Sequence, residues 1–202
     1  MKMNPLEPLL DRRSYSFSKL TYPGPSDEEL KQLFDLVMTT PDHGNIKPWK
    51  FVVARGENMK KAGEMALELY KRQSSDGQVS EDGKRSAEYI SNLPMMILVM
   101  TNVDPNHKKV TIWDQQLSAA AAAQNIMNGL HLMGYGGLWY TFLANEQVKP
   151  LFGMKTDDQI VGAIAVGTPL PEFVKKIKRQ SPAKYCFEWQ GLGVPPSELF
   201  EK

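Results

Sequence analysis

Two arginines and a serine in a row, Arg12-Arg13-Ser14, form the first stretch of this chain that could do chemistry. Guanidinium groups hold phosphate oxygens through charge-assisted, bidentate hydrogen bonds, and a neighbouring hydroxyl adds a further donor. The stretch therefore predicts a site for a phosphate group. The alternative is a solvated basic helix end, which the helix dipole would stabilise.

A second stretch, Pro41–Pro48, sets polar residues between two prolines. Asp42, His43 and Asn45 carry side chains that can hydrogen-bond the edge of a planar ring. The alternative is an ordinary turn framed by the prolines. In either case the stretch is expected to join a helix to a strand.

The third stretch runs from Gly134 to Trp139 and contains three glycines. Glycine lets a backbone approach a flat ligand closely and offers its N–H groups to that ligand. Trp139 would stack near such a ligand or pack in the core. Together the three stretches predict a site for a planar, anionic ligand.

Other common site types have no motif in this sequence. The chain has no Gly-x-Gly-x-x-Gly, no phosphate loop ending in Gly-Lys-Ser or Gly-Lys-Thr, and no Gly-x-Ser-x-Gly. His43, His107 and His131 do not have the spacing of metal ligands. A metal site and a hydrolase driven by side chains therefore lack support.

Length and composition narrow the class of protein further. The 202 residues are expected to form a single domain over 1–202 that can bury a sizeable core. A net charge of +1 with no basic block argues against nucleic acid and against an anionic membrane as partner. Cys186 is the only cysteine, which fits a reducing compartment, and no signal peptide pattern is visible. We therefore expect a cytoplasmic protein.

The stretch from Leu117 to Trp139 is expected to organise the rest of the chain. Its first part predicts a long helix that includes five alanines in a row, Ala119–Ala123. Apolar residues then recur at spacings of four and three, and Gly134 supplies a stop. A helix this long and apolar is the buried spine of a fold or half of a subunit interface. We predict that it is the central helix and that it also meets a partner copy.

The remaining elements alternate between helices and strands. We predict helices over 5–11, from a Ser26–Glu29 capping box to just before Pro41, over 58–72 and over 145–152; strands over 49–54, 94–100, 138–140 and 160–166; a mobile polar excursion over 73–86; and a C-terminal arm over 175–202. The strands are apolar on both faces, so both faces of the sheet should be covered. The expected fold class is α+β, with a three-layer α/β/α sandwich.

In these motifs the chain resembles the FMN-dependent nitroreductase family, and most closely its small YdjA-like branch. The resemblance covers nearly all of the first 170 residues, in the order and roughly the spacing of the family. It rests on Arg12-Arg13-Ser14, the run 40–51, the pieces 106–108 and 113–115, Gly134–Trp139, and the run 161–169 that ends in Gly-Thr-Pro.

The resemblance implies a homodimer with two FMN molecules at the subunit interface and a mixed or antiparallel central sheet. Arg12, Arg13 and Ser14 would hold the phosphate and ribityl chain of FMN. Pro41, Asp42 and His43 of the other subunit would border the isoalloxazine. The candidate cofactor-binding residues are Arg12, Arg13, Ser14, Thr39, Pro41, Asp42, His43, Asn45, Gly134, Gly137, Trp139, Tyr140 and Thr141. The stretch 129–134 matches a segment assigned to the nicotinamide nucleotide.

In function, the resemblance implies an FMN-dependent NAD(P)H oxidoreductase. NAD(P)H would deliver hydride to flavin N5, and a nitroaromatic, quinone or enone would then take two electrons in a ping-pong cycle. The cofactor carries this chemistry, so no catalytic acid is required of the protein. The alternatives are the same fold with another outcome, such as dehalogenation or flavin fragmentation under a longer lid, and a non-catalytic flavin-binding dimer.

The chain departs from the larger members of the family in two places. Ser16 stands where those members carry an Arg or Lys near the N1–O2 edge of the flavin. Those members also place basic residues near the C-terminus on the phosphate. Lys175, Lys176, Lys178 and Arg179 are the candidates here, and the sequence does not choose among them.

Overall fold

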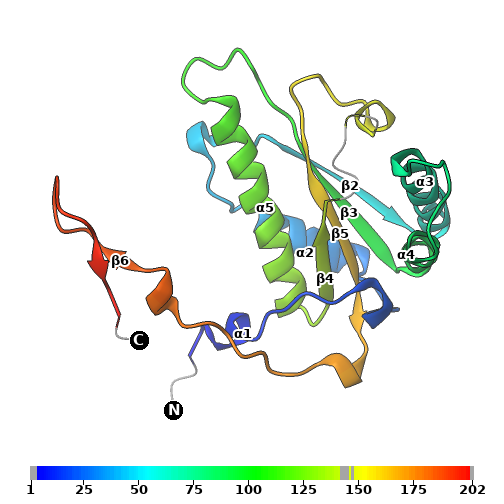
Figure 1. The fold of residues 1–202 in the computed structure, drawn as a ribbon, viewed down its shortest axis with the longest axis horizontal. Helices are drawn as coiled ribbons and strands as arrows, with labels where there is room; N and C mark the ends of the chain where they lie inside the picture. The colour runs from blue at the N-terminus through cyan, green and yellow to red at the C-terminus, as the bar shows by residue number, and fades with distance from the viewer. Residues whose placement is uncertain (1–3, 142–145, 147, 201–202) are drawn as a thin grey trace.

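The computed structural model describes residues 4–141, 146 and 148–200. An antiparallel sheet lies at its centre, with strands in the order β1 (Leu20–Thr21), β5 (Ile160–Pro169), β3 (Met95–Thr101) and β2 (Trp49–Arg55). Strand β4 (Gly136–Tyr140) also pairs with β5. The sheet thus ends in β2 on one side and in β4 on the other (Figure 1).

Helices cover both faces of this sheet. Along β3, Ile97 and Val99 belong to a core shared with α2 (Asp27–Val37) and α5 (Ile112–Leu132). Met96 and Leu98 belong to a second core shared with α3 (Glu57–Gln73) and α4 (Glu81–Asn92). Successive strand residues point to opposite faces, so an all-apolar strand needs cover on both sides. The predicted α+β three-layer sandwich is confirmed.

Helix α5 is the central helix that the sequence predicts. Its 21 residues span about 30 Å. Ala119, Ala122 and Ala123 are fully buried against the sheet and α2. At Gly129 a Cβ would lie 2.5 Å from Leu33 Cδ1, so α2 and α5 approach closely there. The other side of α5 faces outward, where the large apolar residues Trp113, Leu117 and Leu132 are 65%, 49% and 53% exposed.

Short elements complete the chain. They are α1 (Glu7–Leu10) and β6 (Phe187–Glu188) with β7 (Ser197–Glu198), together with the 3₁₀ turns Phe17–Lys19, His43–Asn45, Lys149–Phe152, Pro171–Phe173 and Pro182–Lys184. The predicted helix over 145–152 is observed only as the turn Lys149–Phe152, and its residues 145 and 147 lie outside the described part of the chain. Within the described residues, no helix has both the length and the apolar character needed to cross a bilayer.

The polar excursion predicted over 73–86 has the wrong boundaries. Gln73 is the last residue of α3, and residues from Glu81 onward form the first half of α4. Ser80 caps α4 by accepting a hydrogen bond of 3.1 Å from the Gly83 main-chain N–H. The helix buries only Gly83, Ala87 and Ile90 against α3, and so narrow a stripe leaves its sequence looking uniformly polar.

The C-terminal segment runs past α1 and ends in the β6–β7 hairpin, away from the sheet and its helices (Figure 1). Tyr185, Phe187 and Trp189 are all more than half exposed on this segment. Such a segment fits the predicted arm, because its apolar side chains have no core of their own chain to enter.

Candidate functional site

Strand β4 presents a free edge. In an antiparallel pair the main-chain groups of alternate residues point toward the partner strand and away from it. The Gly137 carbonyl accepts a hydrogen bond of 3.1 Å from the Tyr15 N–H and bridges to Ser14, so Gly137 points away from β5. Trp139 is two residues further along the strand, so its main-chain groups also point to this outer edge. The segment that carries Ser14 covers the edge only at its beginning.

The side chains of Trp139 and Tyr140 point to opposite faces of the sheet. Trp139 packs on the α5 side and donates a hydrogen bond of 3.2 Å from Nε1 to the Val161 carbonyl. Tyr140 packs on the α3 side, where its Oη donates to Met96 Sδ at 2.8 Å. Burial raises the pKa of Tyr140 well above its ordinary value. The tyrosine side chain is therefore part of the core, and β4 offers a ligand chiefly its main chain.

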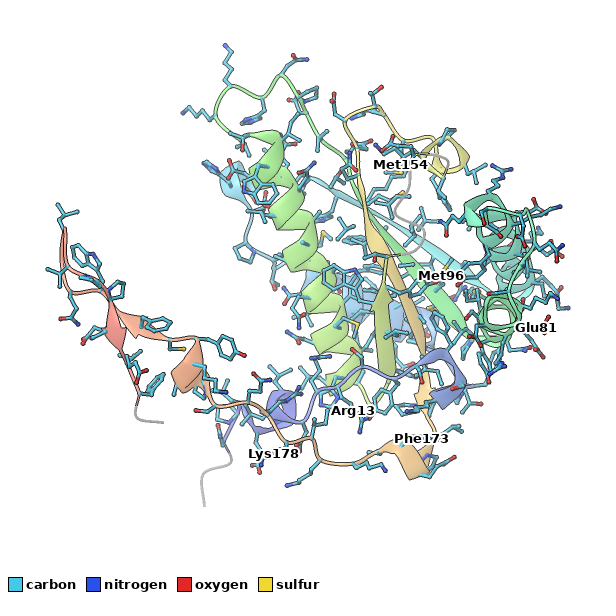
Figure 2. All side chains as sticks on the ribbon, viewed as in Figure 1. Arg13, Glu81, Met96, Met154, Phe173 and Lys178 are labelled. Atoms are coloured by element: carbon cyan, nitrogen blue, oxygen red, sulfur yellow. The ribbon has the colours of Figure 1, made fainter. Side chains whose placement is uncertain are left out.

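Three arginines gather beside this edge. Arg13 donates hydrogen bonds from Nη1 to the carbonyls of Phe173, at 3.2 Å, and Lys175, at 3.4 Å (Figure 2). Its buried Nε has no hydrogen-bond partner among the described residues. Arg179 donates to the main-chain oxygens of Leu10 and Arg12.

The positive charge of this group is not compensated. Burial and then the charge of Arg179 lower the pKa of Arg12. No ion pair in the described part of the chain joins Arg12, Arg13 or Arg179 to a carboxylate. Arg12 and Arg179 bring two cations together, and the buried Arg13 Nε on the same segment lacks a partner; guanidinium donors of this kind are satisfied by a phosphate. The residues present therefore fit a phosphate-bearing ligand, and Arg179 is the C-terminal cation that joins the cluster.

The loop Pro41–Pro48 runs along α5 toward the N-terminal end of that helix, starting from Thr40, whose Oγ1 accepts a hydrogen bond of 2.8 Å from Asn125. His43 Nδ1 is 3.5 Å from Asp114 Oδ2 in the first turn of that helix. The carboxylate of Asp42 is turned inward, is 2% exposed and accepts hydrogen bonds from Lys47. The Asp42 carboxylate thus faces the interior of the loop, whereas the His43 side chain is 59% exposed; the expected contact of either residue with a ring edge stays a prediction. Among the other candidates here, Asn45 Oδ1 accepts from Lys47 Nζ, Thr39 Oγ1 donates to the Leu36 carbonyl at 2.7 Å, and Pro41 is exposed.

One chain does not bring all the predicted residues together. The arginine group lies near the C-terminal end of α5, where His131 Nε2 is 2.7 Å from the Pro8 carbonyl. Asp114, beside the Pro41–Pro48 loop, lies about 25 Å away along the helix axis at about 1.5 Å per residue. His43 thus lies far from Arg12–Ser14, whereas Thr40 lies beside Asn125, closer to the C-terminal end of α5.

Two of the candidate glycines are explained by backbone conformation or by packing within the chain. Gly134 ends α5 with φ at +86°, and the Tyr135 N–H then bonds back to the Leu130 carbonyl at 2.8 Å. At Gly137 a Cβ would lie 2.9 Å from Met127 Sδ, so this glycine lets β4 pack against α5. Neither glycine needs a ligand to explain it. Thr141 is exposed at the end of β4.

The described residues contain no group of three or more His, Cys, Asp or Glu side chains that could hold a metal ion. The model of the Nitroreductase family matches residues 9–168, which include Arg12–Ser14, the Pro41–Pro48 loop and the sheet except the last residue of β5, but not Arg179. The chain belongs to this family. Membership in this family accounts for the order of the Arg12–Ser14, Pro41–Pro48 and Gly134–Trp139 motifs along the chain.

Individual relatives agree with this assignment. The chain is 32% identical over 169 residues to YdjA of Escherichia coli strain K12, whose name proposes an NAD(P)H nitroreductase, with 83% of this chain and 89% of that protein covered. The fold is similar to a nitroreductase-like protein from Bacillus cereus, with a TM-score of 0.75, 19% identity, and 95% and 98% of the two chains covered. It is also similar to a nitroreductase-type protein from Desulfovibrio desulfuricans solved in complex with FMN, with a TM-score of 0.68, 20% identity, and 93% and 98% covered.

Proposed function

We propose that this protein is an FMN-dependent NAD(P)H oxidoreductase of the nitroreductase type. The observation that carries the proposal is the uncompensated arginine group beside the free edge of β4, because it offers an anion site next to main-chain donors. When bound, FMN supplies two-electron transfer from NAD(P)H to an electron-poor acceptor such as a nitroaromatic or quinone, in a ping-pong cycle. FMN-bound and NAD(P)H-named relatives support the same assignment.

The residues of this chain bind and orient the cofactor. Arg12, Arg13 and Arg179 hold the phosphate, and Ser14 lies where the ribityl chain leaves it. The main chain of Trp139 and Thr141 offers hydrogen bonds to the edge of the ring system. A planar ring laid along β4 would be shielded from water on the side that faces the sheet.

The second half of the site comes from a second copy. In the proposed arrangement the Pro41–Pro48 loop beside the ring belongs to the partner chain. Two copies with α5 helices antiparallel bring the loop of one to the β4 edge of the other. The outward-facing Trp113, Leu117 and Leu132 supply the apolar contact for this pairing. The exposed aromatic side chains of 185–189 make the C-terminal arm a further contact with the partner.

An absorbance spectrum of the purified protein, followed by anaerobic addition of NADPH and NADH, tests this proposal. A yellow protein that bleaches with either nucleotide and recovers with a nitroaromatic or quinone supports the reductase. A yellow protein that stays inert would instead identify a non-catalytic flavin carrier. The segment 73–86 packs with α3 and α4 on the face of the sheet opposite α5, so it does not form the longer lid expected of the other outcomes on this fold.

A further inference from the structure

The loop Pro41–Pro48 contains unusual backbone conformations. Asn45 and Lys47 have φ angles of +55° and +51°, and they are the only non-glycine residues with positive φ in the described part of the chain. Gly44, just before them, has φ at +78°. The left-handed region is costly for a lysine, whose Cβ then crowds the backbone. Strained residues persist only where the surrounding contacts hold them, so this loop must be held by specific contacts.

One carboxylate supplies those contacts. Asp42 Oδ2 accepts a hydrogen bond of 2.9 Å from the Lys47 main-chain N–H, and Oδ1 accepts one of 2.6 Å from Lys47 Nζ. The same Nζ donates to Asn45 Oδ1 at 2.7 Å. The main chain and the side chain of Lys47 therefore bind the same carboxylate. These bonds are made in the conformation in which Lys47 has a positive φ.

The ion pair is well protected from solvent on the acidic side. The Asp42 side chain is 2% exposed, while that of Lys47 is 39% exposed. Burial raises the pKa of the Asp42 carboxyl, but the hydrogen bonds from Lys47 lower it more, so the pKa falls below its ordinary value. Lys47 Nζ also lies 5.6 Å from the ring centre of Trp49, a buried residue of β2. The pair therefore ties the loop to the sheet.

We propose that Asp42 and Lys47 are positioning residues for the ligand site, and that neither contacts the ligand. They hold the loop in its strained form so that His43 and the main chain at Gly44 and Asn45 meet the flavin bound by the partner subunit. This role rests on the proposed function. It assigns the carboxylate of Asp42 to the interior of the loop, and the ring contact to the groups beside it.

Lys47→Met tests the role, because it removes the ammonium group and keeps most of the aliphatic stem. Lys50→Met is the matched control, since Lys50 is an exposed lysine on the adjoining strand that forms no ion pair with the described residues. Asp42→Asn and the double variant complete a cycle. Two readouts are needed: hydrogen exchange of the 41–49 amides in apoprotein, and the FMN dissociation constant with the visible circular dichroism of the bound flavin.

The expected result has two parts. Lys47→Met and Asp42→Asn speed exchange in the loop, weaken FMN binding about tenfold and change the flavin dichroism, while Lys50→Met has none of these effects. The double variant is no worse than the worse single variant, because both remove one interaction. Faster exchange with unchanged FMN affinity and dichroism would overturn the positioning role. If wild-type protein takes up no FMN, the proposed function fails and this role with it, while the exchange data still report the contact itself.

Discussion

Arg179→Ala should show whether Arg179 acts on the phosphate of the ligand or on another part of it. Arg179 lies on the C-terminal segment, and its guanidinium donates to main-chain oxygens of Leu10 and Arg12, next to the Arg12 guanidinium. It has no carboxylate partner among the described residues. In the proposed site the charge of Arg179 therefore acts on the FMN phosphate. Riboflavin lacks the phosphate, so its affinity should not depend on Arg179.

The size of the effect follows from the exposure of this side chain. A hydrogen bond to a charged group contributes about 1.5–3 kcal/mol, and solvent screening reduces this at an exposed position. We expect a loss of about 1–2 kcal/mol, which is about a 5- to 30-fold increase in the FMN dissociation constant. Riboflavin binding should stay constant. The stability of the apoprotein should change by less than about 0.5 kcal/mol, because the loss of the hydrogen bonds to the Leu10 and Arg12 carbonyls is offset by relief of the repulsion on Arg12.

Fluorescence titration of apoprotein with FMN and with riboflavin measures both constants. Lys178→Ala is the matched control: it removes a neighbouring exposed cation of the same segment that makes no hydrogen bond with the described residues (Figure 2). The FMN effect should also shrink as salt is added, because the removed interaction is ionic. Equal weakening of FMN and riboflavin, or equal effects of the two variants, would show that Arg179 acts on the fold and not on a phosphate.

Three further outcomes are expected. Ser16→Lys restores a cation near the flavin and should raise its midpoint potential by about 20 mV in a dye-linked titration, as expected from about 1 kcal/mol at an exposed site; no shift would place this residue away from the ring. Leu117→Glu puts a charge on the outward face of α5 and should weaken the dimer at least about tenfold by sedimentation with little change in monomer folding; an unaltered dimer would move the interface elsewhere. Gly129→Ala places a Cβ 2.5 Å from the fully buried Leu33. The cost of overpacking, about 1–3 kcal/mol, should exceed the gain in helix propensity of about 1 kcal/mol and lower the midpoint of urea unfolding. A higher midpoint would show that α2 can move aside.

Hydrophobic periodicity was enough to predict the layers and the central helix. The all-apolar strand at 94–100 and the alanine-rich helix could only be buried, and the structure buries both. Helix α4 was missed for the same reason, because its buried side consists of a glycine, an alanine and one isoleucine. A buried stripe made mainly of small residues carries little hydrophobic signal in the sequence, although it lets the helix pack closely on its neighbour.

The site shows a different limit. Residue types in Arg12-Arg13-Ser14 and Pro41–Pro48 suggested ligand chemistry, but orientation depends on contacts that no local pattern contains. The polarity of Asp42 suggests a contact with a ring edge, and no residue pattern indicates that its carboxylate is bound by the lysine five residues later. Arg179 joins Arg12 across 167 positions, on a segment without periodicity, so only the fold could select it from four basic candidates.

In the proposed dimer, the length of α5 decides how the site is built. Each chain carries an anion site near the C-terminal end of the helix and a loop whose His43 lies beside Asp114 near its N-terminal end, and the proposed pairing supplies the two parts of a site from different chains. Antiparallel pairing completes two sites at once, each with its phosphate held by one chain and its ring bordered by the other. A ligand bound by both chains stabilises the paired state by mass action, and pairing in turn raises the affinity for the ligand. Flavin retention and dimerisation should therefore fall together in Leu117→Glu, although Leu117 belongs to neither half of the site.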